Sequence, residues 1–83
     1  MGVPPIGKYT HKQGQYLAFI YYYTKIRGVP PAEAEMKRYF SVTPPAVHQM
    51  ILDLEERGLI TRTPGAARSI RLTLPRTELP DLE

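Results

Sequence analysis

Proline and glycine divide this chain into short segments, and that division limits the folds open to it. Nine prolines and six glycines stand among its 83 residues. Proline ends a helix or opens its first turn, and glycine commonly closes one. Residues 12–27 contain no proline and carry apolar side chains at three- and four-residue spacing, which predicts a helix that ends at Gly28. Residues 32–39 predict a short second helix, and residues 43–57 predict a third that stops at Gly58.

After Gly58 the pattern changes from helical to extended. Residues 59–63 predict a strand, Pro64-Gly65 a turn, and residues 69–74 alternate with period two. We therefore expect a mainly α fold with a small β-hairpin, in which a three-helix bundle precedes the hairpin. The side chains expected to face inward come from all three helices: Tyr16, Leu17, Phe19, Ile20, Tyr23, Thr24, Met36, Phe40, Val47, Ile51 and Leu54.

The predicted domain occupies residues 10–74. Residues 1–9 contain proline and glycine without periodicity, so we expect an irregular lead-in. Residues 75–83 contain proline and acid without a pattern, so we expect a flexible tail. The terminal Leu82-Glu83 resembles a cloning-site remnant and is given no functional weight.

The composition argues against several classes of function. The chain has no cysteine, which removes disulfides, thiolate nucleophiles and cysteine-bound zinc and fits a reducing cytoplasm. No apolar run approaches the roughly 20 residues that span a bilayer. His11 and His48 lie in different segments, and no carboxylate pair is spaced for acid–base catalysis or metal binding. We therefore expect no enzymatic activity, no cofactor or metal, no membrane association and no small-molecule ligand.

Positive charge is concentrated in the predicted hairpin. Residues 59–76 contain four arginines and no acid, whereas residues 77–83 contain three acids. Guanidinium groups bind phosphate oxygens in a fixed fork, so phosphate is one expected ligand of this segment. The alternative is a solvated strand edge.

The order of three helices and a hairpin, with the tight link at residues 40–43, is typical of a winged helix-turn-helix. In that fold the third helix lies in the DNA major groove and the hairpin is the wing. From about Thr10 to Leu74 the sequence also resembles the N-terminal DNA-binding domain of the LexA repressor family. The matching segments are Tyr16-Leu17, Phe19-Ile20, Gly28-Val29-Pro30-Pro31, Thr43-Pro44, Leu54 to Ile60, Pro64-Gly65 and Arg68 to Leu72.

This resemblance implies a bacterial transcriptional repressor, cytoplasmic and associated with the nucleoid, that binds double-stranded DNA as a homodimer. The family's repressors also carry a self-cleaving domain with a serine–lysine dyad. This chain supplies none, so we expect the DNA-binding half or a stand-alone relative. Ala32 stands where the family usually has a serine or threonine cap, and Tyr39 and Ser41 replace a small residue and a glycine.

Candidate DNA contacts follow from this expected fold. Base contacts are expected from the start of the third helix, because glutamine pairs with adenine, histidine with a purine edge, and small apolar groups with the thymine methyl. These residues are Pro45, Ala46, His48 and Gln49. Backbone contacts are expected from one hydroxyl and five cations: Thr43, Lys37, Arg38, Arg62, Arg68 and Arg71. For each of these residues the alternative is an ordinary polar or charged side chain on a solvated face.

A second interpretation is a winged helix that binds protein, as an interaction module or a regulatory subunit. Tyr21, Tyr22 and Tyr23 cover most of a helix circumference, so at least one must leave the core. Together with Leu52, which lies off the inward stripe of its helix, they are then a partner interface. The alternative is partly exposed core. Acidic residues in the third helix favour protein binding, whereas the acid-free arginine segment favours DNA.

Overall fold

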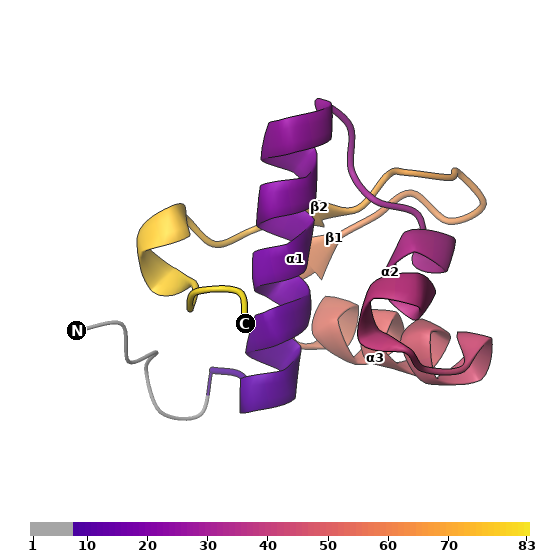
Figure 1. The fold of residues 1–83 in the computed structure, drawn as a ribbon, viewed down its shortest axis with the longest axis horizontal. Helices are drawn as coiled ribbons and strands as arrows, with labels where there is room; N and C mark the ends of the chain where they lie inside the picture. Colours follow the sequence, from indigo (N-terminus) through magenta and orange to yellow (C-terminus); the bar gives the residue numbers. More distant parts are fainter. Residues whose placement is uncertain (1–7) are drawn as a thin grey trace.

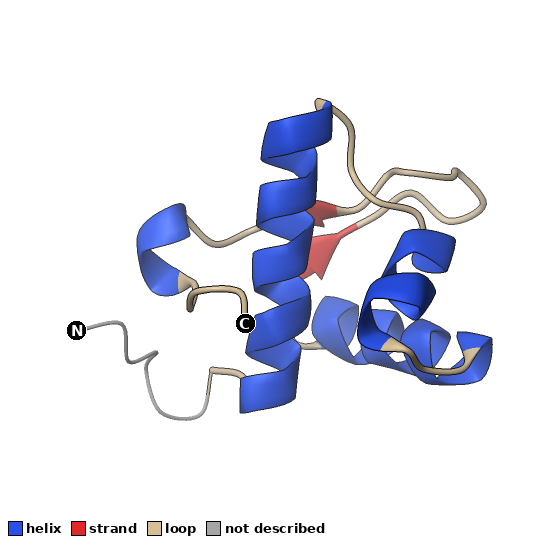
Figure 2. Cartoon of the chain, viewed as in Figure 1, coloured by secondary structure: helices blue, strands red, loops and turns tan. Residues whose placement is uncertain are grey.

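The computed structural model describes residues 8–83, in which three α-helices are followed by a two-stranded hairpin (Figure 1). Helix α1 spans His11–Arg27, α2 Glu33–Phe40 and α3 Pro44–Glu56; strands β1 and β2 span Ile60–Thr61 and Arg71–Leu72, and a 3-10 turn, η1, spans Arg76–Glu78. The predicted fold class is confirmed (Figure 2). Most of the lead-in expected at residues 1–9 lies outside the described residues.

Helix α1 is the central element of the fold. The Thr10 hydroxyl accepts a hydrogen bond from the Gln13 N–H (3.1 Å), and the Gln13 side chain accepts one from the Thr10 N–H (2.9 Å). This reciprocal capping fixes the start of the helix. Gly28, in the left-handed conformation at φ 81°, ends it. Residues 13–20 are all buried, because the hairpin and the other helices lie on one side of α1 and the C-terminal segment on the other (Figure 1).

Helices α2 and α3 form the helix-turn-helix. The link between them turns at Ser41, which adopts the left-handed conformation (φ 55°, ψ 49°) that favours glycine. Thr43 then caps α3, since its hydroxyl accepts a hydrogen bond from the Ala46 N–H (3.3 Å). Pro44 follows in the first turn, where a missing N–H has no cost. The predicted start signal of the third helix is therefore confirmed.

The hydrophobic core lies where the three helices meet the hairpin. The rings of Tyr16 and Phe40 stack with their centroids 4.1 Å apart and tie α1 to the end of α2. Three of the predicted core residues, Tyr23, Thr24 and Phe40, are only half-buried. The other predicted residues are buried: Tyr16, Leu17, Phe19, Ile20, Met36, Val47, Ile51 and Leu54. Among residues 8–83, no helix has both the length and the apolar character needed to cross a bilayer.

The hairpin is shorter than the sequence pattern predicts. Strands β1 and β2 pair antiparallel only at Ile60 with Leu72 and at Thr61 with Arg71, rather than over residues 59–63 and 69–74. The reason lies at Thr63, whose N–H donates to the Ser69 hydroxyl (2.9 Å) and whose carbonyl accepts from the same hydroxyl (3.1 Å). A side chain thus takes the backbone groups that a longer ladder would pair, and Gly65 and Arg68, with positive φ angles of 78° and 56°, form the turn between.

Residues 75–83 differ from the flexible tail that their composition predicts. They form η1 and continue beside α1 (Figure 1), with Leu79 only 5% exposed. The Gln15 side chain donates a hydrogen bond to the Asp81 carbonyl (3.0 Å) and accepts one from the Glu83 N–H (2.8 Å). The segment packs because a polar side chain of α1 satisfies its backbone groups and the core accepts its leucine. Glu83, predicted to belong to a cloning remnant, is therefore part of this packing.

Candidate nucleic-acid interface

The four candidate base-contact residues lie on the solvent face of α3. Pro45, Ala46, His48 and Gln49 are all exposed, whereas Val47, between them, is fully buried. This division follows from helical geometry, because residues three and four positions from Val47 share its inward face and the intervening ones face away. The N-terminal half of α3 therefore presents two apolar and two hydrogen-bonding side chains on one open surface.

Both hydrogen-bonding side chains on this surface have acidic neighbours. The His48 Nδ1 lies 3.4 Å from a Glu33 carboxylate oxygen of α2, and the Gln49 amide donates to the Asp53 carboxylate at 2.9 Å. These contacts are exposed, so each contributes little to stability and exchanges readily for another partner. No role at this site was expected of Glu33 or Asp53 from the sequence. In the structure, each is the partner of one candidate base-contact side chain.

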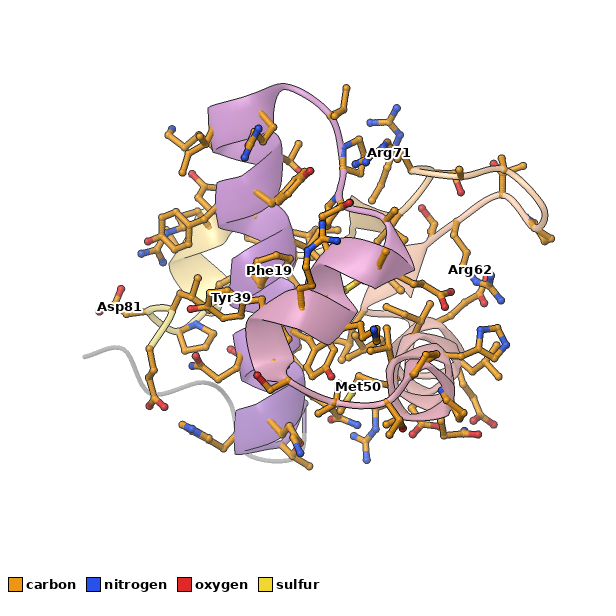
Figure 3. All side chains as sticks on the ribbon, turned by 45° about the vertical axis from the view of Figure 1, so that its right-hand side comes forward. Phe19, Tyr39, Met50, Arg62, Arg71 and Asp81 are labelled. Atoms are coloured by element: carbon orange, nitrogen blue, oxygen red, sulfur yellow. The ribbon has the colours of Figure 1, made fainter. Side chains whose placement is uncertain are left out.

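Two of the candidate backbone-contact cations are exposed and unpaired. Within the described part of the chain, neither the Lys37 side chain of α2 nor the Arg71 side chain of β2 forms a hydrogen bond or an ion pair. Figure 3 shows Arg71 and Arg62 on the side of the molecule that carries the hairpin and α3, away from Asp81. The exposed Thr43, beside the start of α3, adds a hydroxyl to this side. The Lys37, Arg71 and Thr43 side chains could contact an anion without breaking an existing ion pair.

The other three candidate cations are paired with glutamates. The Arg62 Nε contacts Glu55 at 3.0 Å, and an Arg38 nitrogen contacts Glu35 at 3.6 Å. Arg68 makes a two-point contact with Glu35, at 3.0 Å and 3.3 Å. The sequence predicted an arginine-rich hairpin, but the partners that partly neutralise two of its arginines lie on α3 and α2.

Several donors contact the Glu35 carboxylate at the start of α2. Its carboxylate accepts the Ala32 N–H at 2.7 Å, in the place where Ala32 itself supplies no capping side chain. This backbone hydrogen bond lowers the pKa of Glu35, and the contacts with Arg68 and Arg38 lower it further. Glu35 therefore stays ionised and holds two cations that would otherwise be free. No periodicity in the sequence marks this role.

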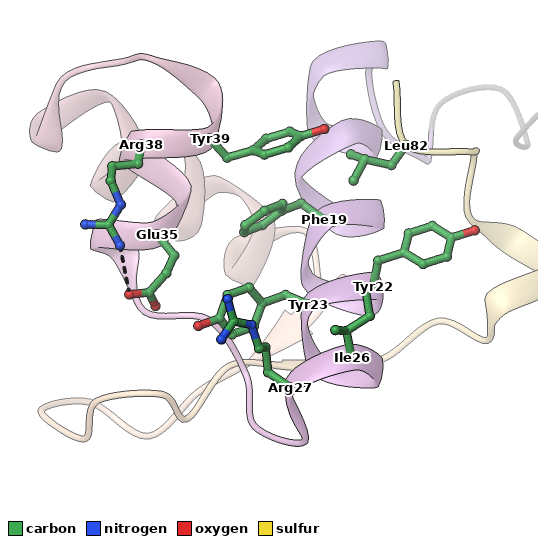
Figure 4. A pocket seen from close by; sticks show the side chains of 9 residues that line it. All are labelled: Phe19, Tyr22, Tyr23, Ile26, Arg27, Glu35, Arg38, Tyr39 and Leu82. Atoms are coloured by element: carbon green, nitrogen blue, oxygen red, sulfur yellow. Dashed lines mark ion pairs between the residues drawn. The ribbon is translucent and has the colours of Figure 1, made fainter.

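The three consecutive tyrosines are all half-buried, and the Tyr21 and Tyr22 rings contact each other with centroids 5.1 Å apart. The Tyr22 hydroxyl accepts a hydrogen bond from Arg76 (2.8 Å), while Tyr23 packs against Phe19 with ring centroids 5.7 Å apart. Tyr22 and Tyr23 line an open apolar groove between α1 and α2 (Figure 4). Tyr21 and the half-buried Leu52 lie outside this groove. Two of the four predicted interface residues therefore line this groove.

No group of three or more histidine or acidic side chains in residues 8–83 is placed to hold a metal ion. The described surface thus offers exposed hydrogen-bonding groups on α3 and unpaired cations on α2 and β2, but no metal centre.

Comparison with known proteins agrees with this geometry. Residues 7–69 match the family model described as the LexA DNA binding domain. The LexA repressor of Thermosipho melanesiensis is 38% identical over 65 residues, which are 78% of this chain and 33% of that protein. The chain therefore spans about a third of the length of this curated relative. Since the family match covers most of the chain, including all three helices and the turn of the hairpin, the chain belongs to the LexA DNA-binding domain family.

Proposed function

We propose that this chain binds double-stranded DNA in a sequence-specific manner as a transcriptional repressor, with the N-terminal half of α3 in the major groove. The observation that carries this proposal is the exposed face of α3, together with unpaired cations on α2 and β2, in a chain of the LexA DNA-binding domain family. The chain would then act on the chromosome, in the bacterial cytoplasm. Its role would be binding rather than catalysis.

The base contacts are assigned by the chemistry of each side chain. Gln49 would form two hydrogen bonds with an adenine, and His48 would contact a purine edge. Pro45 and Ala46 would lie against a thymine methyl. Binding would exchange the exposed contacts with Asp53 and Glu33 for base contacts, at little cost because both carboxylates remain solvated.

The backbone contacts are assigned mainly to the groups that have no carboxylate partner. Lys37 and Arg71 are exposed cations, and the Thr43 hydroxyl lies at the start of α3. Arg38, Arg62 and Arg68 present less charge to phosphate because each is paired with a glutamate.

The expected number of backbone contacts also leads us to propose a dimer on DNA. About four phosphate contacts per subunit would give a salt slope near −4 and weak binding by a monomer at physiological salt. Two subunits on related half-sites would supply the missing affinity.

Selection of bound sequences from a random duplex pool, followed by anisotropy titration at several salt concentrations, tests the proposal. Gln49→Ala should weaken binding to the selected duplex by about 1–3 kcal/mol and leave binding to unrelated duplexes unchanged. Lys37→Gln should weaken binding to all duplexes and reduce the salt slope by about 1.

Lys12→Gln is the matched control, because Lys12 lies beside Glu83 of the C-terminal segment, on a different surface from α3. Its substitution should change neither specificity nor the salt slope. No duplex binding at low salt, or a selected site that Gln49→Ala and His48→Ala together leave equally well bound, would refute the proposal.

A further inference from the structure

Arg68 connects the hairpin to three other parts of the chain. Its guanidinium donates to the Tyr23 hydroxyl of α1 (3.3 Å) and to the Pro30 carbonyl of the α1–α2 link (3.2 Å). The same group makes the two-point contact with Glu35 of α2. A two-point arginine–carboxylate contact fixes orientation as well as distance. Arg68 is also one of two described non-glycine residues with positive φ (56°), a conformation that costs free energy.

The hairpin has little else to hold its turn in place. Strands β1 and β2 share only two residue pairs, and a hairpin of that size is marginal by itself. The Ser69 hydroxyl bonds only to Thr63 and Ala66, inside the hairpin. Within residues 8–83, Arg68 makes the only hydrogen bonds and ion pairs that join segment 64–69 to the helices. The direction of the hairpin turn therefore depends on this one side chain.

Charge leads to the same conclusion. Glu35 lies at the start of α2 with its side chain only 16% exposed, and it faces Arg68 and Arg38. A cation held this way is poorly placed to neutralise a DNA phosphate, because approach to the phosphate would have to compete with a close carboxylate. The exposed side chain of Arg71 of β2 has no carboxylate partner among residues 8–83, so it can neutralise a phosphate without that competition.

We propose that Arg68 and Glu35 are positioning residues for DNA binding: their ion pair locks the hairpin turn against the start of α2, and Arg71, not Arg68, contacts the DNA backbone. This inference rests on the proposed function. Charge alone predicts that removing the Glu35 carboxylate tightens DNA binding. A positioning role predicts that the same change weakens it.

Glu35→Gln is the decisive variant. Glutamine still accepts the Ala32 N–H, so the start of α2 is retained, but the ion pair with Arg68 is lost. Removing a negative charge near DNA should tighten binding if Arg68 is an ordinary phosphate contact. If the pair positions the hairpin, Glu35→Gln should weaken binding to a duplex carrying the selected site by roughly 3- to 10-fold.

Glu56→Gln is the matched control, because it makes the same charge change at an exposed α3 residue without a partner among residues 8–83. It should bind DNA as tightly as the unmodified chain or slightly more tightly. Arg68→Lys should weaken binding as much as Arg68→Gln, because lysine keeps the charge but lacks the planar group that reaches three acceptors. In the Glu35→Gln background, a further Arg68→Gln change should have little additional effect.

A second readout does not require DNA. Backbone ¹⁵N relaxation should show greater motion at Gly65, Ala66 and Ala67 in Glu35→Gln and Arg68→Lys, with the helices unchanged. The inference is overturned if the Glu35→Gln variant binds DNA as tightly as the unmodified chain. It is also overturned if relaxation at these amides is unchanged. The inference is overturned as well if the losses of DNA affinity from Glu35→Gln and Arg68→Gln add fully in the double variant. If the unmodified chain binds no duplex, the proposed function fails, and the relaxation data still decide whether the pair holds the hairpin.

Discussion

Replacing Gly14 with alanine separates helix propensity from tertiary packing, because the two effects have opposite signs at this residue. Gly14 lies inside α1, where glycine costs about 1 kcal/mol relative to alanine. Propensity by itself therefore predicts that Gly14→Ala stabilises the protein. The structure predicts the opposite, since an added Cβ would lie 2.7 and 3.0 Å from two ring carbons of Tyr9 and 3.1 Å from the Pro80 side chain.

The magnitude follows from what must move. Tyr9 is only 8% exposed, and its hydroxyl donates a hydrogen bond to the Glu78 carbonyl. Overpacking costs about 1–3 kcal/mol, and a displaced ring would also lose a hydrogen bond that contributes about 1 kcal/mol. After the propensity gain, we expect a net loss of about 1–3 kcal/mol. For a chain of this size that loss lowers Tm by roughly 5–25 °C.

Thermal and urea unfolding followed by circular dichroism measure this change, with Tyr9→Ala as the reference background. Without the Tyr9 ring, the cost of Gly14→Ala should fall by at least about 1 kcal/mol, because the closest contact is gone. A higher Tm for Gly14→Ala in the unmodified chain, or an equal cost in both backgrounds, would show that the close packing of the Tyr9 ring on α1 is not what requires glycine.

Three further changes test local features of the fold. Ser41→Gly should raise the free energy of unfolding by about 0.5–1 kcal/mol in urea titrations, because Ser41 is left-handed at φ 55°; an unchanged midpoint would contradict this. Ala32→Ser should stabilise α2 by about 0.5–1 kcal/mol by completing a capping box with Glu35, and an equal or lower Tm would argue against that geometry. The lowered pKa of Glu35 means that its contribution to stability is complete above the ordinary carboxyl pKa and is lost as pH falls through the lower folded value. The stability difference between the unmodified chain and Glu35→Gln should therefore shrink below about pH 4, and a difference that grows there would reverse the assigned sign.

The helices could be predicted because their signals are local. Val47, Ile51 and Leu54 are spaced to share one helix face, and all three are fully buried. Gly28 closes α1 in the left-handed conformation that its place in the sequence indicates. The strand lengths could not be predicted in the same way, because the Ser69 hydroxyl bonds to the Thr63 backbone groups that the alternating pattern would pair in a ladder.

The candidate site was only partly predictable. The exposed face of α3 follows from helical periodicity, so the places of His48 and Gln49 were accessible from sequence. The sequence could not show that Arg68 has a carboxylate partner and Arg71 has none, because both stand in the same acid-free segment. This difference depends on Glu35, which lies 33 residues before Arg68 and reaches it only in the folded chain.

By itself, the sequence determined the order of the elements, the ends of the helices, the inward faces and the resemblance to a DNA-binding family. These properties depend on side-chain spacing and caps that act over a few residues. Only the tertiary structure decided which arginines keep their charge available and where residues 75–83 lie. Both depend on contacts between distant segments, such as Arg68 with Glu35 and Gln15 with Asp81, which form only when the path of the chain brings those groups together.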